Sequence, residues 1–211
     1  MKAIIFDLDG VICFTDKYHY MAWKEMADEL GVYFDEKIND RLRGVSRMDS
    51  LEIILEKYTG KTLTEEEKEH LAEKKNTTYR KLLEKMTPSD VTDEVRKTLA
   101  ELRKRGYKLS LGSSSKNAKF ILEKIDLMDA FDAISDGTNI KKSKPDPEVF
   151  LKGAEFLNEL PGDCLVVEDA IAGIDAAKSG GMLAAGIGDA KSYEKTDYPL
   201  ETFSDLLKIA L

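Results

Sequence analysis

A regular alternation of strand-like and helix-like segments from Pro88 onward sets the tightest limit on how this chain can fold. Short apolar runs that suit buried strands lie at residues 107–111, 131–134, 164–167 and 182–185, and helix-spaced apolar residues lie between them. This alternation is typical of a mostly parallel sheet covered by helices on both faces. An apolar run at residues 3–8 supplies one more strand. We therefore predict an α/β fold with a Rossmann-like sheet.

The segment between the first strand and Pro88 has a different texture. It is charged, favours helix and is almost free of Gly and Pro. Apolar residues recur there at helical spacing, namely Trp23, Met26, Ala27 and Leu30, then Leu51, Ile54, Leu55 and Tyr58. Thr64 with Glu67 three residues later matches a capping box that opens a helix toward Leu83. The segment is predicted to be a small helical bundle.

Because the helices precede any second strand pattern, we interpret them as an insertion into the α/β unit. The predicted domains are a catalytic core of residues 1–14 and 88–211 and a helical cap of residues 15–87. The chain crosses between them twice, which makes a plausible hinge.

Composition narrows the class of protein. The 211 residues include 42% hydrophobic and 34% charged side chains, as in globular proteins, and the net charge of −8 argues against nucleic acid as a partner. We find no apolar run long enough for a membrane span and no signal peptide, so we expect a cytoplasmic protein that does not bind membranes. We also expect a monomer. Cys13 and Cys164 lack the spacing of a zinc site and are favoured as small buried hydrophobes.

Two carboxylates end the first strand, at Asp7 and Asp9, and Gly10 follows them. Alternation along a strand points both acids to one side, where their like charges favour either bound Mg²⁺ or a division into acid and base. An ordinary strand that runs into an acidic turn is an equally good interpretation of this motif alone.

Three further polar clusters follow predicted strands or precede helices: residues 113–117, residues 143–147, and Glu168 with Asp169. Each alone is more often a helix cap or an exposed turn. Together they favour a site, because ligands of open parallel sheets bind beyond the carboxyl ends of the strands. Acids from two strand ends suit Mg²⁺, while Ser113 and Lys144 suit a phosphate. Phosphoryl transfer through an aspartyl-phosphate fits this set.

The four clusters, in this order, resemble the motifs of the haloacid dehalogenase superfamily of phosphotransferases, and the resemblance covers essentially the whole chain. It implies Asp7 as nucleophile and Asp9 as general acid/base. It implies Ser113 and Lys144 as phosphate-site residues. It also implies Glu168 and Asp169 as magnesium ligands, together with Asp7 and the Asp9 backbone carbonyl.

A narrower resemblance, to sugar-phosphate mutases of that superfamily, concerns the predicted cap. It implies that substrate is bound by Thr15, His19, Trp23, Arg43, Gly44, Val45, Ser46, Arg47, Lys75, Asn76, Ser115, Lys116 and Asn117. Arg47 and Asn117 would hold a distal phosphate, and His19 would help to orient Asp9. Without the resemblance, residues 42–47 are better interpreted as a solvated basic turn, and His19 and Trp23 as packed side chains.

The implied reaction interconverts β-glucose 1-phosphate and glucose 6-phosphate through a bisphosphate, with a small sugar phosphate as the only partner. A magnesium-dependent sugar-phosphate phosphatase is the alternative. Arg43 stands where related mutases carry lysine, and Phe14 replaces a polar residue, so the resemblance is weaker at these two positions.

Overall fold

The computed structural model describes residues 1–210, and a six-stranded parallel sheet organises most of them. The strand order is β3-β2-β1-β4-β5-β6, and every neighbouring pair is parallel. The strands are β1 (Ala3–Phe6), β2 (Lys108–Gly112), β3 (Ala133–Ser135), β4 (Cys164–Glu168), β5 (Leu183–Gly186) and β6 (Tyr198–Pro199). The predicted α/β fold is confirmed.

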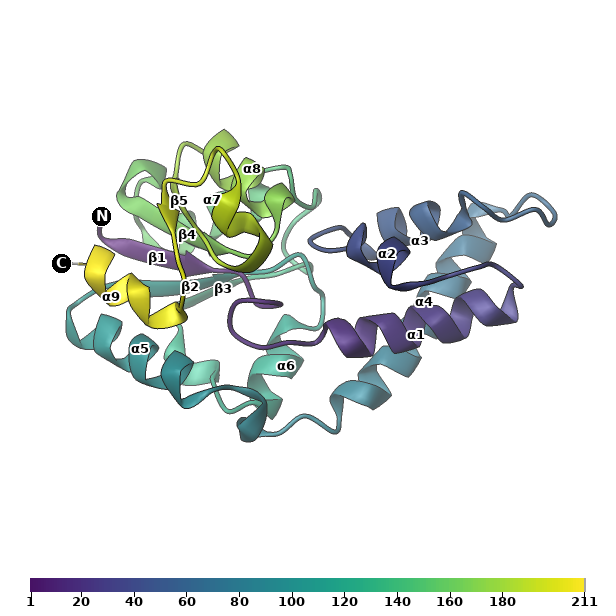
Figure 1. Cartoon of the computed structure of the whole chain (residues 1–211), viewed down its shortest axis with the longest axis horizontal. Coiled ribbons are helices and arrows are strands. Elements are labelled where there is room, and N and C mark those ends of the chain that lie inside the picture. The colour runs from purple at the N-terminus through teal and green to yellow at the C-terminus, as the bar shows by residue number, and fades with distance from the viewer. Residues whose placement is uncertain (211) are drawn as a thin grey trace.

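Helices cover both faces of the sheet, as Figure 1 shows. Alternate residues of β1 point to opposite faces: Ile4 and Phe6 pack into one buried cluster, and Ala3 and Ile5 into another. The first cluster includes residues of α5 (Asp93–Lys104), α6 (Ala118–Lys124) and α9 (Leu206–Ile209), and the second includes residues of α7 (Glu148–Leu157) and α8 (Ile171–Ser179). Short 3-10 turns occupy Pro88–Asp90, Met128–Ala130, Pro161–Asp163, Gly188–Ser192 and Phe203–Asp205.

Four helices form a separate lobe beside the sheet (Figure 1). They are α1 (Asp16–Glu29), α2 (Glu36–Asp40), α3 (Arg47–Leu55) and α4 (Glu65–Leu83). This lobe has a buried cluster of its own, which includes Trp23, Leu51 and Ala72. The capping box of Thr64 and Glu67 is present at the start of α4. The separate cluster agrees with the predicted cap, whose boundaries stay a prediction. Leu211, the end of the predicted core domain, lies outside the described residues.

Several boundaries differ from the sequence prediction. The first strand ends at Phe6, not at residue 8, because the N–H groups of Ile12 and Cys13 both donate to the Leu8 carbonyl and turn the chain. The run at 131–134 begins after a 3-10 turn, so only Ala133–Ser135 pairs as a strand. Helix α3 ends at Leu55 and excludes Tyr58, and neither α2 nor β6 was predicted.

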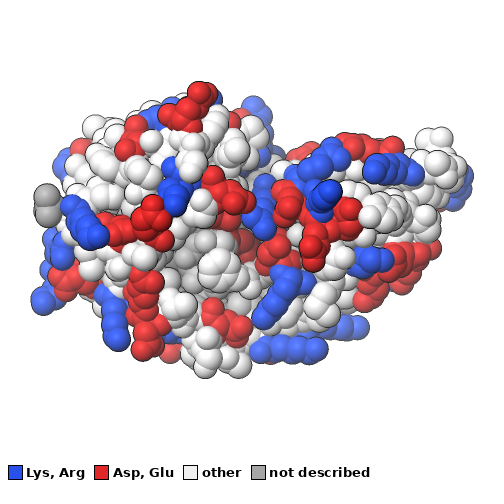
Figure 2. Space-filling view, in the orientation of Figure 1, with Lys and Arg blue, Asp and Glu red and all other residues white. Residues whose placement is uncertain are grey.

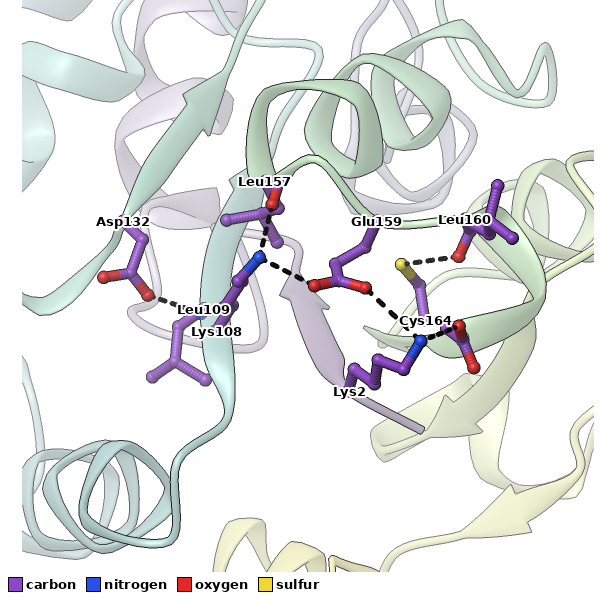
Figure 3. Close-up of polar contacts among 9 residues, drawn as sticks. Lys2, Lys108, Leu109, Asp132, Leu157, Glu159, Leu160 and Cys164 are labelled. Atoms are coloured by element: carbon purple, nitrogen blue, oxygen red, sulfur yellow. Dashed lines mark hydrogen bonds and ion pairs between the residues drawn. The ribbon is translucent and has the colours of Figure 1, made fainter.

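A polar network closes the amino ends of the central strands, opposite the edge where the acids lie (Figure 3). The Glu159 carboxylate lies between two lysines, 2.7 Å from Lys108 Nζ and 4.0 Å from Lys2 Nζ. Lys108 also donates to the Leu157 carbonyl at 2.9 Å. These contacts hold the starts of β1 and β2 against the segment that leads into β4. A ligand can therefore approach the sheet at the opposite edge, where the strands have their carboxyl ends.

Acidic and basic side chains are interspersed over both lobes on the face drawn in Figure 2. Among residues 1–210, no helix combines the length and the apolar character that crossing a bilayer requires.

Candidate active site

Three carboxylates meet at the carboxyl edge of the sheet. Strands β1 and β4 are neighbours in register, with Phe6 beside Val167, so Asp7 and Glu168 leave the sheet side by side. One oxygen each of Asp7, Glu168 and Asp169 lie within 4.8 Å of one another. These acids come from stretches of chain far apart in sequence, and the parallel topology brings them together as expected.

Lys144 compensates part of this negative charge. Its buried ammonium donates to the Asp7 carboxylate and, at 2.5 Å, to Glu168 Oε1. Burial alone would lower the pKa of Lys144, but attraction to Asp7 and Glu168 outweighs it and raises the pKa above its ordinary value. Lys144 therefore stays a cation and offsets part of the charge of the acids that it contacts.

The close approach of three carboxyl groups suits a divalent cation, which would favour their ionised forms. Burial first, and then repulsion by Glu168 and Asp7, raise the pKa of Asp169 to about 8. Two glycines leave room for the acids: a Cβ at Gly10 would overlap the Asp169 carboxylate, and one at Gly173 would overlap Glu168. An all-oxygen carboxylate set of this kind fits Mg²⁺, so Asp7, Glu168 and Asp169 could hold that ion.

Asp9 lies near this group, but its carboxylate belongs to a different contact. Its Oδ1 accepts from the Thr15 hydroxyl, and Thr15 Oγ1 in turn accepts from Tyr79 at 3.1 Å. The Asp9 side chain is not in the cluster that Asp7, Glu168 and Asp169 form, and a metal-binding role for Asp9 through its backbone carbonyl stays a prediction. Burial first, and then the charge of Asp7, raise the pKa of Asp9 to about 7. At neutral pH this carboxyl can both give and take a proton.

The loop after β2 presents consecutive serines beside the acids. Ser113 Oγ accepts from the Ser115 N–H at 3.2 Å, and Ser115 Oγ accepts from the Asn117 N–H at 3.1 Å. Both hydroxyls act as acceptors within the loop, so each can still donate its own proton to an anion. Lys116 is exposed and lines the same cavity.

A buried lysine faces the site from the other lobe. Lys75 Nζ lies 3.0 Å from His19 Nδ1 and sits over the rings of Trp23 and Tyr79, at 4.5 and 4.6 Å. Burial, followed by the charge of Arg47, lowers the pKa of Lys75. Burial, followed by the charges of Lys75 and then Arg47, lowers the pKa of His19. His19 is thus neutral at physiological pH.

A chain of hydrogen bonds joins the two lobes across the cavity. Arg47 Nη1 donates to Glu73 Oε2 at 2.9 Å, and Asn76 Nδ2 donates to Glu73 Oε1 at 3.2 Å. Asn117 Nδ2 donates to Asn76 Oδ1 at 2.9 Å, and Arg80 Nη1 donates to Asn117 Oδ1 at 3.1 Å. Arg47 and Asn117, predicted to act at one end of the substrate, therefore belong to one network.

The turn before α3 also reaches the other lobe. Arg43 Nη1 lies 3.2 Å from Asp189 Oδ2, which follows β5. Gly44, with φ +73°, lies near Ala170 and Ala172 at the start of α8. Ser46 caps α3 by accepting from the Asp49 N–H at 3.2 Å, which places Arg47 at the first turn of that helix.

One cavity of about 1630 Å³ collects these groups. Of the residues predicted for the site, all but Thr15 line it; Thr15 is fully buried behind Asp9. Sequence reasoning missed Glu73, Tyr79 and Asp189, which also line it. Tyr79 follows Lys75 by one helical turn, and this spacing was the available signal for it. Glu73 and Asp189 gave no such signal, because their partners are distant in sequence.

Comparisons with known proteins agree over nearly the whole chain. A model of the haloacid dehalogenase-like hydrolase family matches residues 1–181. The beta-phosphoglucomutase of Bacillus subtilis is 44% identical over 207 residues, which cover 98% of this chain and 92% of that protein. A phosphorylated carbohydrates phosphatase of Thermotoga maritima is 33% identical over 184 residues, covering 86% of this chain and 82% of that protein.

A solved structure is similar as well. The crystal structure of beta-phosphoglucomutase from Clostridium difficile has a TM-score of 0.92 and 38% identity, and the match covers 100% of this chain and 96% of that one. Both lobes of the present structure therefore have counterparts in that protein.

Proposed function

The chain belongs to the haloacid dehalogenase-like hydrolase family, and from this premise we propose that it is a β-phosphoglucomutase. It would interconvert β-glucose 1-phosphate and glucose 6-phosphate through an aspartyl-phosphate and β-glucose 1,6-bisphosphate. One observation supports the proposal: the carboxylates around Asp7 and the cationic side chain of Arg47 line the same cavity. Such a cavity suits a sugar that has a phosphate at each end.

Asp7 is the proposed nucleophile, because its carboxylate lies at the centre of the acid group and is held by Lys144. Mg²⁺ bound by Asp7, Glu168 and Asp169 would neutralise charge on the transferred phosphoryl group. The Ser113 hydroxyl and the Lys144 ammonium would bind the phosphoryl oxygens and fix their orientation. Positioning and charge neutralisation then account for most of the rate.

Asp9 would move the protons. In the first half-reaction the 6-hydroxyl of β-glucose 1-phosphate attacks phosphorylated Asp7; the O–P bond to Asp7 breaks, and the Asp9 carboxylate takes the hydroxyl proton. After the bisphosphate turns round, Asp7 attacks the phosphorus at C1. The C1 oxygen leaves with the proton from Asp9, which gives glucose 6-phosphate and restores phosphorylated Asp7. A pKa of about 7 for Asp9 favours transfer in both directions.

Residues of the helical lobe would select the sugar hydroxyl over water. Arg47 and Asn117 are proposed to bind the distal phosphate, and His19 and Lys75 to cover the reacting end. Arg43, Gly44, Val45, Ser46, Trp23, Asn76, Ser115 and Lys116 are proposed to line the substrate site, with Thr15 acting through Asp9. When the lobes are closed, water is excluded from phosphorylated Asp7. A cytoplasmic location and a monomeric state remain predictions.

A coupled assay tests the proposal. β-Glucose 1-phosphate, Mg²⁺ and a trace of bisphosphate should give steady formation of glucose 6-phosphate, detected through its oxidation. The α anomer should give little signal, and Asp7→Ala should give none. Asp129→Ala, which alters an exposed acid that does not line the cavity, is the control and should retain activity.

A sugar-phosphate phosphatase is the second candidate, and the Thermotoga maritima relative favours it. Release of inorganic phosphate without glucose 6-phosphate oxidation would replace the mutase proposal with this one.

A further inference from the structure

Glu73 binds Arg47, the residue that the proposed function assigns to the distal phosphate. It lies on α4, and its two carboxylate oxygens accept from Arg47 and from Asn76 at 2.9 and 3.2 Å. Both residues line the cavity, as Glu73 itself does. The guanidinium thus has an anionic partner from its own chain.

The same network engages the second residue assigned to that phosphate. Asn117 donates to Asn76 Oδ1 at 2.9 Å, and Asn76 donates onward to Glu73. Arg47 therefore donates directly to the Glu73 carboxylate, and Asn117 is linked to the same carboxylate through Asn76. An arriving anion competes with Glu73 for Arg47 and releases Asn76 from its acceptor.

Exposure indicates which partner moves. The Glu73 side chain is 66% exposed, whereas that of Arg47 is 24% exposed. Glu73 can turn into water and keep its carboxylate solvated, while Arg47 stays in the cavity wall. The contact is therefore exchangeable, and the energetic difference between its two states is small.

We propose that Glu73 is a specificity-determining residue that holds the place of the distal phosphate on Arg47 until a ligand exchanges with it. The inference rests on the proposed function, since it deepens the account of the distal end of that site. A doubly charged phosphate competes well against a single carboxylate for a bidentate guanidinium. A sugar hydroxyl or a neutral group does not, so the exchange favours ligands that carry phosphate at that end.

The test is calorimetric binding of glucose 6-phosphate without bisphosphate. Because Glu73→Gln removes the competing charge but keeps the shape, the dissociation constant should fall about two- to fivefold, the range for an ion pair of this exposure. In an Arg47→Ala background, Glu73→Gln should change the constant by less than about 1.5-fold, because the competitor and the ligand then have no shared target.

Glu69→Gln is the matched control. Glu69 precedes Glu73 by four residues on α4 and also lines the cavity, but among residues 1–210 no hydrogen bond or ion pair joins it to Arg47. It should leave the constant nearly unchanged. Equal tightening by Glu69→Gln, or no tightening by Glu73→Gln, would overturn the proposal. The coupled assay tests the mutase proposal separately. If the unmodified protein showed no mutase turnover there, the mutase proposal would fail, but the comparison of dissociation constants would remain valid.

Discussion

Asp9, the proposed acid/base residue, has an ionisation that the fold changes strongly. Its pKa lies at about 7 rather than 3.8, first because it is buried and second because Asp7 is near. Between these two pH values an unfolded chain releases the Asp9 proton while the folded chain keeps it. The folded state therefore loses stability as the pH rises from about 4 to 7, by at most about 4 kcal/mol for a shift of about three units.

Asp9→Asn should remove this pH-dependent loss while it abolishes turnover. Asparagine does not ionise, and its side-chain oxygen can still accept from Thr15. In chelator-treated protein we expect a higher Tm than the unmodified chain at pH 8 and a smaller gain at pH 5, measured by thermal scans. An equal gain at both pH values would contradict the assigned pKa.

At the scale of elements, the turn after β1 depends on a glycine. Gly10 has φ +83°, and a Cβ there would overlap the Asp169 carboxylate. Gly106 has φ +87° and nothing within 4 Å of an added Cβ. The two glycines share their backbone strain and differ in their surroundings.

Gly10→Ala and Gly106→Ala therefore separate strain from crowding. Each should cost about 1 kcal/mol of unfolding free energy for the left-handed backbone. Only Gly10→Ala should displace Asp169 and weaken magnesium binding by tenfold or more, measured by metal titration of activity. If Gly106→Ala weakened magnesium binding equally, overlap with Asp169 would not be the cause.

Asp205 stabilises the turn that leads into α9. Its carboxylate accepts from the Glu201 and Thr202 N–H groups and from Lys208, at 3.0, 2.9 and 2.6 Å. The Lys208 bond, followed by the Thr202 N–H, lowers its pKa to about 2 from 3.8. The ionised Asp205 carboxylate therefore stabilises the folded state fully above pH 4, and this stabilisation is lost as the pH falls from about 4 toward 2.

We expect Asp205→Asn to lower the Tm at pH 7 and to lower it less at pH 3, because the native carboxylate begins to lose its advantage there. Circular dichroism melts at both values measure this. Lys208→Met is the companion variant, and it should cause part of the same loss. A constant difference across this range would argue against the ionised cap.

The sequence allowed some elements to be predicted and not others, for physical reasons. The capping box at Thr64 is a local pattern, and the meeting of Asp7 with Glu168 follows from parallel strands that end at one edge. Strand β6 has two residues, too few for any periodicity. The pairing of Arg47 with Glu73 depends on how α3 packs on α4, which no local pattern encodes.

At the scale of the whole molecule, few polar contacts join the two lobes. Arg43 pairs with Asp189 at 3.2 Å, Ser143 donates to Asp49 at 3.4 Å, and Arg80 and Asn76 share Asn117. Both members of the Arg43 pair are exposed, so this ion pair is weak. A lobe held in this way can open without unfolding.

Asp189→Arg should shift the molecule toward the open arrangement, because it places a like charge beside Arg43. We expect a larger radius of gyration in small-angle X-ray scattering and a higher KM for the sugar phosphate. The combined variant Arg43→Asp with Asp189→Arg should recover the compact radius. Failure of the swapped pair to recover it would mean that this contact does not hold the lobes together.

The place of β1 at the centre of the sheet has a consequence for synthesis of the chain. Its two neighbours, β2 and β4, begin at Lys108 and Cys164, so the first strand to leave the ribosome waits longest for partners. The helices of residues 16–83, with their own buried cluster, emerge complete during that wait. We therefore expect the nascent polypeptide to fold its inserted part first, with the apolar strand at its start exposed to chaperones until β4 has been translated.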